Sequence, residues 1–482
     1  MTTETEEYDV VVLGAGPTGE NLADYARSAG LTVALVESEL VGGECSYWAC
    51  MPSKALLRPP TALAEARRSP GARQAVKGPL DVAAVLAHRD EYASYWKDDG
   101  QAAWVAKEGI DLVRGHGRLA GERRVTVDVP GGGRRTLTAR HAVGVCTGSR
   151  AAVPDLPGLA EAKPWTSREA TSARQAPGRL AVVGGGVVAA EMAAAWQALG
   201  SRVTMLVRGS GLLARMESFA GELVAEGLTD AGVEIRTGAQ VSEVRRPDPS
   251  GPVTITLADG GELVVDEVLF ATGRAPRTED LGLETVGLTP GQWLTVDDTC
   301  RVTDVPDGWL YAAGDVNHRA LLTHQGKYQA RIAGAAIGAR AGGQPVDTAR
   351  WGSHAATADI DAVPQVVFTD PEAASVGWTA EQAERAGRRI RTVDYDMSKV
   401  AGAGLYADGY RGRARMVVDL DRDHLLGVTF VGYGVGELLH SATVAVVGEV
   451  PMDRLWHAVP SYPTISEVWL RLLEKYRSTA GT

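Results

Sequence analysis

Near its N-terminus the chain reads Val10-Val11-Val12-Leu13-Gly14-Ala15-Gly16-Pro17-Thr18-Gly19, an apolar run followed by a glycine-rich turn. A helical pattern continues to Ala29, and a second apolar run, Leu31 to Val36, ends at Glu37. This order predicts strand, glycine turn, helix and strand. Such a turn lets the backbone close on a pyrophosphate, and a carboxylate at Glu37 can accept hydrogen bonds from a ribose. The segment predicts a mononucleotide-binding unit; the alternative is a tight turn without a ligand.

The same pattern recurs later in the chain, as Val182-Val183-Gly184-Gly185-Gly186-Val187-Val188-Ala189. Gly14 corresponds to Gly184 and Gly30 to Gly200 without any gap, an offset of 170 residues. The chain therefore contains two mononucleotide-binding units, and two nucleotide-like ligands are implied.

The two units differ at the residue that ends their second strand. Glu37 corresponds to Val207, and Arg208 follows. Loss of the carboxylate and gain of a cation favour a 2′-phosphate over a free 2′-hydroxyl, and Arg215 could assist. The second unit is thus expected to bind NADPH, with NADH less favoured; the alternative is a solvated Arg208 with no ligand.

Two cysteines, with four residues between them, stand in Gly42-Gly43-Glu44-Cys45-Ser46-Tyr47-Trp48-Ala49-Cys50-Met51-Pro52-Ser53-Lys54. Cys50 is predicted to begin a helix, whose N-terminus favours a thiolate. This suits a pair that cycles between disulfide and dithiol. The glycine pair lets the backbone approach a bulky ligand, and Lys54 lies one helical turn beyond Cys50. The alternative is two unrelated buried cysteines.

Several segments between and after these motifs also carry predictions. We expect Pro59-Pro60 to interrupt the helix that Cys50 begins. Two similar turns, Cys146-Thr147-Gly148-Ser149-Arg150 and Ala271-Thr272-Gly273-Arg274, follow apolar strands and can close a nucleotide domain. The strand Tyr311-Ala312-Ala313-Gly314-Asp315-Val316 ends in a carboxylate that can hold a sugar-like hydroxyl chain, although an ordinary strand end is an equal alternative. A helix is expected from about Gln325 to Ala341.

Size and charge restrict the class of protein. The chain has 482 residues, enough for about three domains. Its formal net charge of -11 argues against nucleic acid or an anionic membrane as main partner. No apolar run approaches the roughly 20 residues that a membrane helix needs, and the acidic start is no signal peptide. With only four cysteines, of which Cys146 and Cys300 are expected to be packing residues, we expect a cytoplasmic protein.

Together these residues resemble the pyridine nucleotide–disulfide oxidoreductases, the family of dihydrolipoamide dehydrogenase, glutathione reductase and mercuric reductase. The resemblance extends from Tyr8 to about Lys475, and its most specific part is Gly-Gly-x-Cys-x4-Cys-x-Pro-Ser-Lys at 42–54. It implies an α/β fold with two Rossmann-like nucleotide-binding domains and a C-terminal α/β dimerisation domain. The expected domains are an FAD domain (1–155 and 275–346), an NAD(P) domain (156–274) and an interface domain (347–482) that forms a homodimer.

The resemblance also implies roles for individual residues. Cys50 would lie against the flavin as the charge-transfer sulfur, and Cys45 would be the interchange sulfur that meets the substrate. Lys54 and Glu191 look like the family's ion pair beside the flavin. The residues implied at FAD are Gly14, Gly16, Gly19, Glu37, Gly43, Lys54, Gly117, Thr147, Gly148, Ser149, Gly314 and Asp315, the last on the ribityl chain. Those implied at the pyridine nucleotide are Gly184, Gly186, Ala189, Val207, Arg208, Arg215 and Gly273.

The chain departs from the family near its C-terminus. The family's disulfide reductases carry His-Pro-Thr followed by Ser-Glu, whereas this chain reads Tyr462-Pro463-Thr464-Ile465-Ser466-Glu467. The histidine that would serve the thiols as acid and base is thus Tyr462, while Glu467, which would orient it, is retained. Mercuric reductase uses a C-terminal cysteine pair, and this chain has no cysteine after Cys300. Between the two cysteines, Tyr47-Trp48-Ala49 also replaces smaller or amide residues.

These features predict an NAD(P)H-dependent FAD enzyme that moves electrons through Cys45 and Cys50 to a small-molecule acceptor, by family default a small disulfide. An alternative is the same architecture with a quinone, a metal ion or oxygen as acceptor. A second alternative is a lipoamide-dehydrogenase-like subunit of a multienzyme complex, or a redox-responsive binding protein. No resident metal site is predicted.

Overall fold

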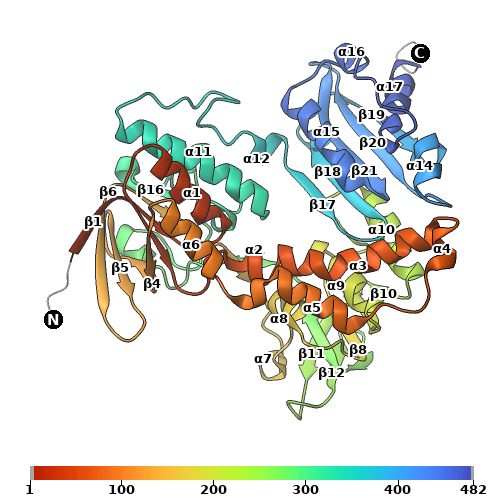
Figure 1. Cartoon of the computed structure of the whole chain (residues 1–482), viewed down its shortest axis with the longest axis horizontal. Coiled ribbons are helices and arrows are strands. Elements are labelled where there is room, and N and C mark those ends of the chain that lie inside the picture. Colours follow the sequence, from red (N-terminus) through yellow and green to blue (C-terminus); the bar gives the residue numbers. More distant parts are fainter. Residues whose placement is uncertain (1–4, 479–482) are drawn as a thin grey trace. The chain divides into compact units, whose positions relative to one another are not determined.

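The computed structural model describes residues 5–478. Within these residues no helix is long and apolar enough to cross a membrane. The chain forms two compact units (Figure 1). The first unit comprises Met1–Met51, Asp90–Arg150 and Arg274–Ile360, and the second comprises Pro52–Arg89, Ala151–Gly273 and Asp361–Thr482.

A largely parallel sheet forms the centre of the first unit. Its order is β3-β2-β1-β6-β5-β4, with β16 also paired to β6. Strands β1, β2, β3, β6 and β16 pair in parallel, whereas β4 and β5 add an antiparallel extension. The strands are β1 (Thr5–Leu13), β2 (Val33–Glu37), β3 (Asp111–Arg114), β4 (His116–Leu119), β5 (Arg124–Asp128), β6 (Arg134–Val145) and β16 (Leu310–Ala312).

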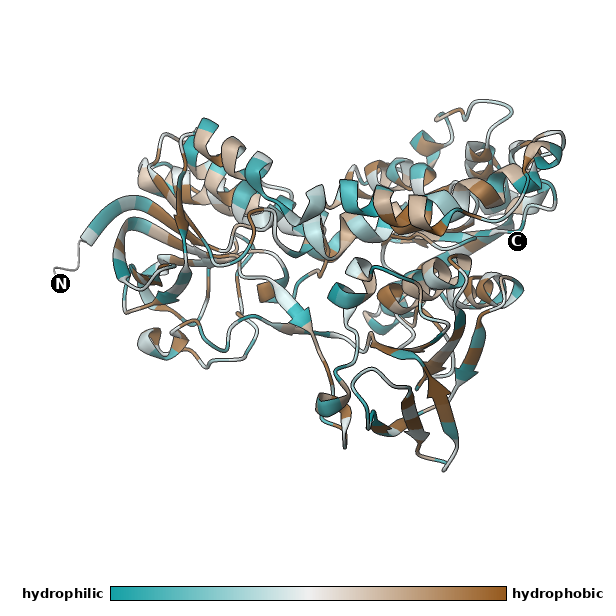
Figure 2. Cartoon of the chain, turned by 60° about the horizontal axis from the view of Figure 1, so that its bottom comes forward, coloured by the Kyte–Doolittle hydropathy of each residue, from teal (hydrophilic) through white to brown (hydrophobic). Residues whose placement is uncertain are grey.

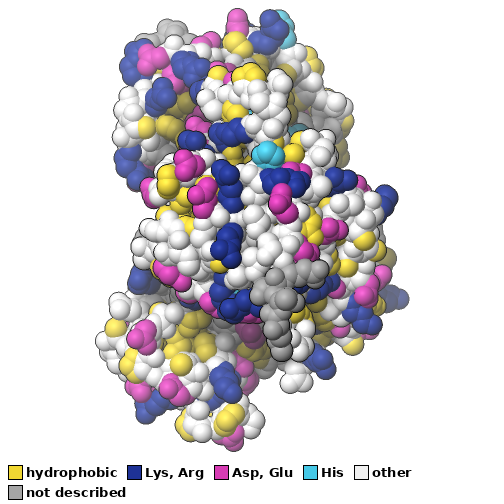
Figure 3. All heavy atoms as spheres, turned by 90° about the vertical axis from the view of Figure 1, so that its left-hand side faces the viewer, with side chains coloured by type: hydrophobic (Ala, Val, Ile, Leu, Met, Phe, Trp, Pro, Cys, Tyr) yellow, Lys and Arg dark blue, Asp and Glu magenta, His cyan; other side chains and the backbone are white. Residues whose placement is uncertain are grey.

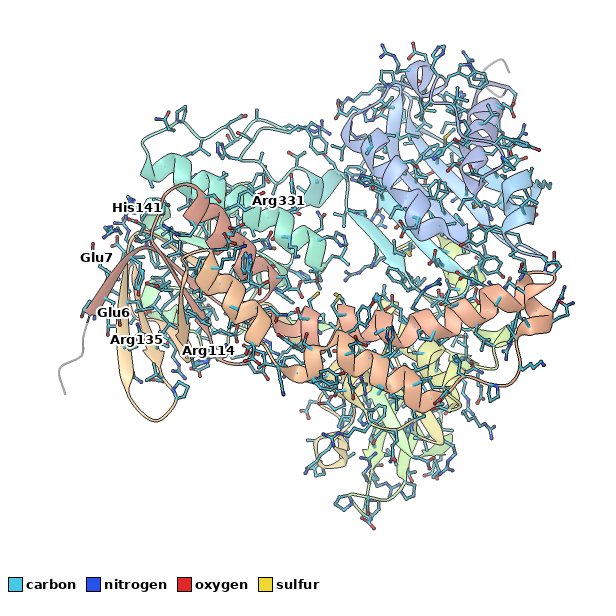
Figure 4. All side chains as sticks on the ribbon, in the orientation of Figure 1. Glu6, Glu7, Arg114, Arg135, His141 and Arg331 are labelled. Atoms are coloured by element: carbon cyan, nitrogen blue, oxygen red, sulfur yellow. The ribbon has the colours of Figure 1, made fainter. Side chains whose placement is uncertain are left out.

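Helices cover this sheet, and α1 (Pro17–Ser28) and α11 (Thr323–Ala341) lie side by side (Figure 1). The other helical segments are α2 (Gly43–Tyr47), η1 (Ser94–Trp96), α6 (Asp99–Lys107), η2 (Leu283–Val286), η3 (Pro306–Gly308), η4 (Asp315–Asn317) and α12 (Ala358–Asp361). At the N-terminal edge, Arg135 pairs with Glu6 at 2.5 Å, which joins β6 to β1 (Figure 4). On the face drawn in Figure 3, basic and acidic side chains are intermixed.

The second unit contains a parallel sheet of order β10-β9-β8-β14 and a small antiparallel sheet of order β11-β12-β13. The strands are β8 (Arg179–Val183), β9 (Arg202–Val207), β10 (Glu234–Thr237), β11 (Val241–Arg245), β12 (Val253–Leu257), β13 (Glu262–Val265) and β14 (Glu267–Phe270). The helices in this part are α4 (Ala72–Ala75), α5 (Val82–Tyr92), α7 (Leu159–Ala162), α8 (Ser167–Ser172), α9 (Val187–Ala198) and α10 (Ser218–Asp230).

The C-terminal part of the second unit is built on an antiparallel sheet of order β17-β18-β21-β20-β19. Its strands are β17 (Pro364–Val367), β18 (Glu372–Gly377), β19 (Ile390–Asp396), β20 (Arg413–Asp419) and β21 (His424–Gly432). Around it lie α13 (Ala380–Arg385), η5 (Met397–Lys399), α14 (Ala401–Tyr406), α15 (Val435–Val447), α16 (Met452–Leu455), η6 (Ile465–Glu467) and α17 (Val468–Ser478). Figure 2 shows hydrophilic and hydrophobic residues alternating along the helices, as expected when one face is buried.

The predicted interruption at Pro59-Pro60 is wrong. Helix α3 (Cys50–Arg68) begins at Cys50, as predicted, but continues through both prolines. Proline removes a backbone donor and crowds the preceding turn. Leu56, in the turn before the prolines, is fully buried in the core of the second unit. Tertiary burial therefore outweighs the local penalty.

The two glycine turns have the same construction. Gly14 and Gly184 both have positive φ, +95° and +135°. A Cβ on Gly14 would lie 2.5 Å from the Cys146 carbonyl oxygen, and one on Gly184 would lie 2.4 Å from that of Ala271. Each glycine thus packs against the first residue of a Thr-Gly turn, and only glycine fits.

This contact predicts a large effect of a small substitution. Gly184→Ala should lower the free energy of unfolding by about 2 kcal/mol, because it adds strain at positive φ and a clash with backbone. Gly186→Ala is the matched control, since its φ is negative and nothing lies within 4 Å of its Cβ position. Urea denaturation of both variants would measure the difference; equal stabilities would contradict the packing argument.

Candidate active site

Cys45 lies on α2 and Cys50 is the first residue of α3; both are free thiols in the structure. The Thr323 hydroxyl, in the first turn of α11, lies 3.3 Å from the Cys50 sulfur. A hydrogen bond with Cys50 is the largest cause of the raised pKa of the Cys45 thiol, and burial is the second. The Thr323 hydroxyl and the Lys327 ammonium oppose this rise.

This asymmetry separates the roles that the two sulfurs can take. Cys50 stands at a helix N-terminus, where partial positive charge stabilises a thiolate. Cys45 holds its proton more firmly while Cys50 is ionised. A negative charge on Cys50 is thus one of the causes that raise the pKa of the Cys45 thiol.

The short helix that carries Cys45 is held from several sides. A Cβ on Gly43, whose φ is +56°, would lie 2.8 Å from the Gly16 Cα, so the glycine pair brings α2 against the first glycine turn. The buried Tyr47 hydroxyl donates to the Val41 carbonyl at 2.9 Å, and the Trp96 indole donates to the Tyr47 carbonyl at 3.1 Å. Tyr47, inserted between the cysteines, is therefore a structural anchor for the Cys45 helix.

The first glycine turn offers a cradle for a phosphate. Gly16 is the N-cap of α1 and makes no side-chain cap bond, so the first-turn N–H groups can bind an anion. Gly19 packs on the Gly14 backbone, where a Cβ would clash at 1.8 Å. The Glu37 carboxylate accepts the backbone N–H of Ala15 at 2.7 Å and retains lone pairs for ribose hydroxyls. These residues fit the adenosine and pyrophosphate of FAD.

The Gly-Asp motif lies beside the first Thr-Gly turn. The Ser149 hydroxyl donates to Asp315 at 2.5 Å, and Arg274 donates to the Ser149 hydroxyl at 2.8 Å. Burial raises the pKa of Asp315, although these partners oppose it. Gly314 adopts φ +82° and donates its N–H to the Gln329 side chain at 2.7 Å. The carboxylate is thus fixed where a hydroxyl chain could bind.

Three more residues predicted at FAD have distinct surroundings. The Thr147 hydroxyl is buried without a hydrogen-bond partner among the described residues, which fits a donor or acceptor reserved for a ligand. Gly148 adopts φ +72°. Gly117 lies in β4, where a Cβ would meet the Leu13 side chain at 2.6 Å. Packing alone therefore accounts for this glycine.

The second glycine turn leads into α9, whose N-terminus is not capped by a side chain. Gly186 is the N-cap of α9 without a side-chain cap bond, and Ala189 is fully buried in the next turn. Val207 is buried at the end of β9, whereas Arg208 and Arg215 are exposed. No ion pair is seen for either arginine in the described part of the chain. Gly273, at φ +143°, accepts a backbone bond from Ala152 at 3.0 Å.

The structure pairs Lys54 with Glu191 as predicted, at 2.7 Å. The Glu191 side chain is 4% exposed and also accepts the Phe368 backbone N–H at 3.0 Å. The Lys54 ammonium stands 4.9 Å above the Phe368 ring, a favourable cation–π geometry. The pair therefore joins α3, α9 and the segment after β17 within the second unit.

Tyr462 and Glu467 have opposite environments. Tyr462 is 74% exposed, and Glu467 is 5% exposed. Arg471 binds one Glu467 oxygen at 2.5 Å, while the other oxygen is buried without a partner in the described part of the chain. Such an unpaired buried oxygen fits a carboxylate that awaits a donor.

Sequence analysis missed several residues at this site. Thr323 was not predicted because the helix was expected to begin at Gln325, two residues too late. Arg274 ends a Thr-Gly turn in the sequence, and the structure shows that it also donates a hydrogen bond to the Ser149 hydroxyl. Phe368 and Gln329 carried no local signal, since their contacts join segments far apart in the sequence.

Comparison with known proteins identifies the family. Residues 8–338 match the model for "Pyridine nucleotide-disulphide oxidoreductase", and residues 363–472 match its dimerisation domain. The chain belongs to this family. It is an FAD- and pyridine-nucleotide-dependent flavoprotein oxidoreductase with two nucleotide-binding domains and a C-terminal dimerisation domain, which supports a homodimer.

The chain is similar over nearly its whole length to relatives of several kinds. It is 32% identical to "Dihydrolipoyl dehydrogenase 3" of Pseudomonas aeruginosa, covering 96% of both chains, and 33% identical to "Mercuric reductase" of Acidithiobacillus ferrooxidans, covering 97% of this chain and 82% of the relative. Among solved structures, LpdA from Mycobacterium tuberculosis has a TM-score of 0.81 at 25% identity, covering 98% of this chain and 99% of that one. The flavoprotein disulfide reductase RclA of Escherichia coli, solved as a Cu(II) complex, shares the fold with a TM-score of 0.82 at 24% identity over 98% and 99%.

The buried ion pair gives a prediction for stability. Lys54→Met should lower the free energy of unfolding by about 1–3 kcal/mol, because it leaves the buried Glu191 carboxylate without its cation. Lys54 is 36% exposed, which keeps the effect below that of a fully buried pair. Arg58→Met, which breaks an exposed pair with Glu65 on the same helix, is the control and should cost less than about 1 kcal/mol. Urea unfolding would compare them, and Lys54→Met/Glu191→Gln should recover part of the loss.

Proposed function

We propose that this enzyme transfers electrons from NADPH through its flavin to Cys45 and Cys50, and from there to a small disulfide. The observation that carries the proposal is the direct interaction of the Cys45 and Cys50 thiols beside Thr323. Two thiols in contact, one at a helix N-terminus and one partly screened by a hydroxyl and a cation, suit reversible disulfide formation.

The proposed domains follow the family pattern: an FAD domain (1–155 and 275–346), an NAD(P) domain (156–274) and an interface domain (347–482). Bound FAD supplies the acceptor for hydride and the donor for the cysteine pair. The first glycine turn and Glu37 would hold its adenosine and pyrophosphate, and Asp315 its ribityl chain. Gly43, Lys54, Thr147, Gly148 and Ser149 are proposed to complete that site.

NADPH is proposed as the electron donor because of the end of β9. Val207 presents no carboxylate to repel a 2′-phosphate, and Arg208 and Arg215 are exposed cations for which residues 5–478 show no ion pair. Gly184, Gly186 and Ala189 would receive the pyrophosphate at the N-terminus of α9. Glu191 and Lys54 would stand near the site of hydride arrival, as the family pattern implies.

The acceptor is the least constrained part of the proposal. The family default is a disulfide, and one relative is named for lipoyl chemistry. A non-disulfide acceptor, such as a quinone, a metal ion or oxygen, is the second candidate, because Tyr462 replaces the family histidine. A tyrosine with an ordinary pKa near 10 is a poor base at neutral pH. Its exposed hydroxyl can still donate a hydrogen bond.

Peptide mapping and turnover together test the function. Air-oxidised protein digested without reductant should yield a peptide linked through Cys45 and Cys50, and denatured protein should release FAD. Anaerobic NADPH oxidation with a disulfide acceptor should fall at least 100-fold in Cys45→Ser, whereas Cys146→Ser is the control. Undiminished disulfide reduction by Cys45→Ser, or release of FMN, would reject the proposal. Turnover only with a quinone would favour the second candidate.

The nucleotide preference gives a separate prediction. Arg208→Glu should raise the KM for NADPH about 10-fold or more, because a carboxylate would repel the 2′-phosphate, while the KM for NADH changes little. Arg202→Glu, at the opposite end of β9, is the control for the change in net charge. Wild-type enzyme that uses NADH at equal or lower concentration would refute the preference.

A further inference from the structure

A cluster of buried polar side chains joins α11, α12 and the segment after the Gly-Asp motif within the first unit (Figure 1). The Asp359 and Gln329 side chains are buried, and the Arg319 side chain is 17% exposed. Each has one buried polar atom without a hydrogen-bond partner within residues 5–478: Asp359 Oδ2, Gln329 Nε2 and Arg319 Nη1. An unpaired buried donor or acceptor destabilises a fold, so three of them in one cluster indicate a missing partner.

Asp359 and Arg319 face each other without a direct hydrogen bond. Asp359 Oδ1 accepts a hydrogen bond from the Gln325 amide at 2.9 Å, and Arg319 Nη2 donates to Asp298. The remaining atoms, Asp359 Oδ2 and Arg319 Nη1, lie 3.8 Å apart. This separation is too long for a hydrogen bond, but one water molecule can contact both atoms. Burial raises the pKa of Asp359 to about 6, so at pH 8 the group is a carboxylate whose Oδ2 needs a donor.

The Gln329 amide completes the cluster. Gln325 and Gln329 are four residues apart on α11, so both side chains lie on the helix face that meets Asp359. The Gln329 side-chain oxygen accepts the Gly314 backbone N–H at 2.7 Å and the Asn317 amide at 2.8 Å. These two bonds establish which end of the amide is oxygen and leave Nε2 as its unpaired donor. The Gln329 side chain also lowers the pKa of Asp359, in agreement with this placement.

We propose that Arg319, Gln329 and Asp359 bind one structural water molecule between them. The water accepts hydrogen bonds from Arg319 Nη1 and Gln329 Nε2 and donates one to Asp359 Oδ2, which matches the three bonds typical of a buried water. A metal cation does not fit, because two of the three groups present N–H donors to it. An anion does not fit either, because the third group is a carboxylate.

The bound water also acts on the Gly-Asp motif. The Gln329 amide that it holds is the acceptor of the Gly314 N–H, and Gly314 adopts φ +82° directly before Asp315. With its Nε2 fixed by the water, the amide cannot rotate away from Gly314. Arg319 and Asp359 are therefore positioning residues for the Asp315 carboxylate. This second step rests on the proposed role of Asp315 in holding the ribityl chain of FAD, whereas the water site does not.

A crystal structure of the flavin-loaded dimer at pH 8, at a resolution that shows ordered water, tests the site. One density peak should lie about 2.6–3.2 Å from all three unpaired atoms. The peak should be lost in Arg319→Lys, which keeps the charge but not the second planar donor. Arg301→Lys, which changes an arginine paired with Asp297 in the same unit, is the control and should keep the peak.

A second variant keeps this test decisive. Asp359→Asn places a third donor around the site, and a water molecule can accept only two, so the peak should again be lost. This variant decides the question if Arg319→Lys does not fold. Direct contact of Asp359 with Arg319 or Gln329 in the wild type, without a peak between them, would overturn the water site. A peak with contacts near 2.1 Å would be a metal ion and would overturn it as well.

The positioning of Asp315 is tested by FAD release from diluted dimer, followed by the rise in flavin fluorescence. Arg319→Lys should release FAD about three- to tenfold faster, as expected when one hydrogen bond is lost, and Arg301→Lys should release it at the wild-type rate. In an Asp315→Ala background, Arg319→Lys should have no further effect, because it acts through Asp315. An equal acceleration in both backgrounds would overturn the positioning role.

The outcomes also separate this inference from the proposed function. If Asp315→Ala alone releases FAD at the wild-type rate, the proposed role of Asp315 fails and the positioning step fails with it. The density peak between Arg319, Gln329 and Asp359 would still confirm or reject the water site. If Asp315→Ala releases FAD faster but Arg319→Lys does not, the role of Asp315 stands and the positioning step alone is wrong.

Discussion

The close packing of α11 on α1 is the constraint on which the candidate active site depends. Gly326, Gly334 and Gly338 face α1 so closely that a Cβ on any of them would lie 2.3 to 2.6 Å from that helix or its cap. Side chains there would force the helices apart at a cost of about 1–3 kcal/mol each. The glycines thus fix the position of the α11 N-terminus, where Thr323 meets Cys50. Backbone packing far from the sulfurs determines their polar surroundings.

The two glycine turns share one construction. In each, the strand that carries the turn pairs in parallel with the strand that ends in a Thr-Gly turn, so Leu13 lies beside Val145 and Val183 beside Phe270. The packing of the first glycine is therefore set by the sheet and is common to both. The two units differ at the end of the second strand, where one has Glu37 and the other has Val207.

Sequence patterns were sufficient for features that depend on local order. The strand–turn–helix periodicity located both glycine turns, and the helix beginning at Cys50 followed from its first-turn residues. The pairing of Lys54 with Glu191 followed from family resemblance. Where tertiary contacts compete with propensity, the sequence was misleading: the helix through Pro59-Pro60 persists because its neighbours are buried.

Other features of the site could not be predicted because they join distant segments. Thr323 is 273 residues from Cys50 along the chain. Thr323 and Lys327 lie near the cysteine pair because α11 packs on α1. No periodicity reports such a contact. Glu20 reads as an ordinary polar residue of an amphipathic helix, and only the structure shows that one of its oxygens is buried and unpaired.

The groups around the cysteine pair act differently on its two sulfurs. A dithiol needs one sulfur that ionises readily and one whose proton can be removed on demand. At Cys50, the N-terminus of α3 and the neighbouring Thr323 hydroxyl can stabilise a thiolate. At Cys45, the hydrogen bond with Cys50 and burial raise the pKa of the thiol. Removal of that proton at a useful rate needs a base whose pKa lies near the working pH.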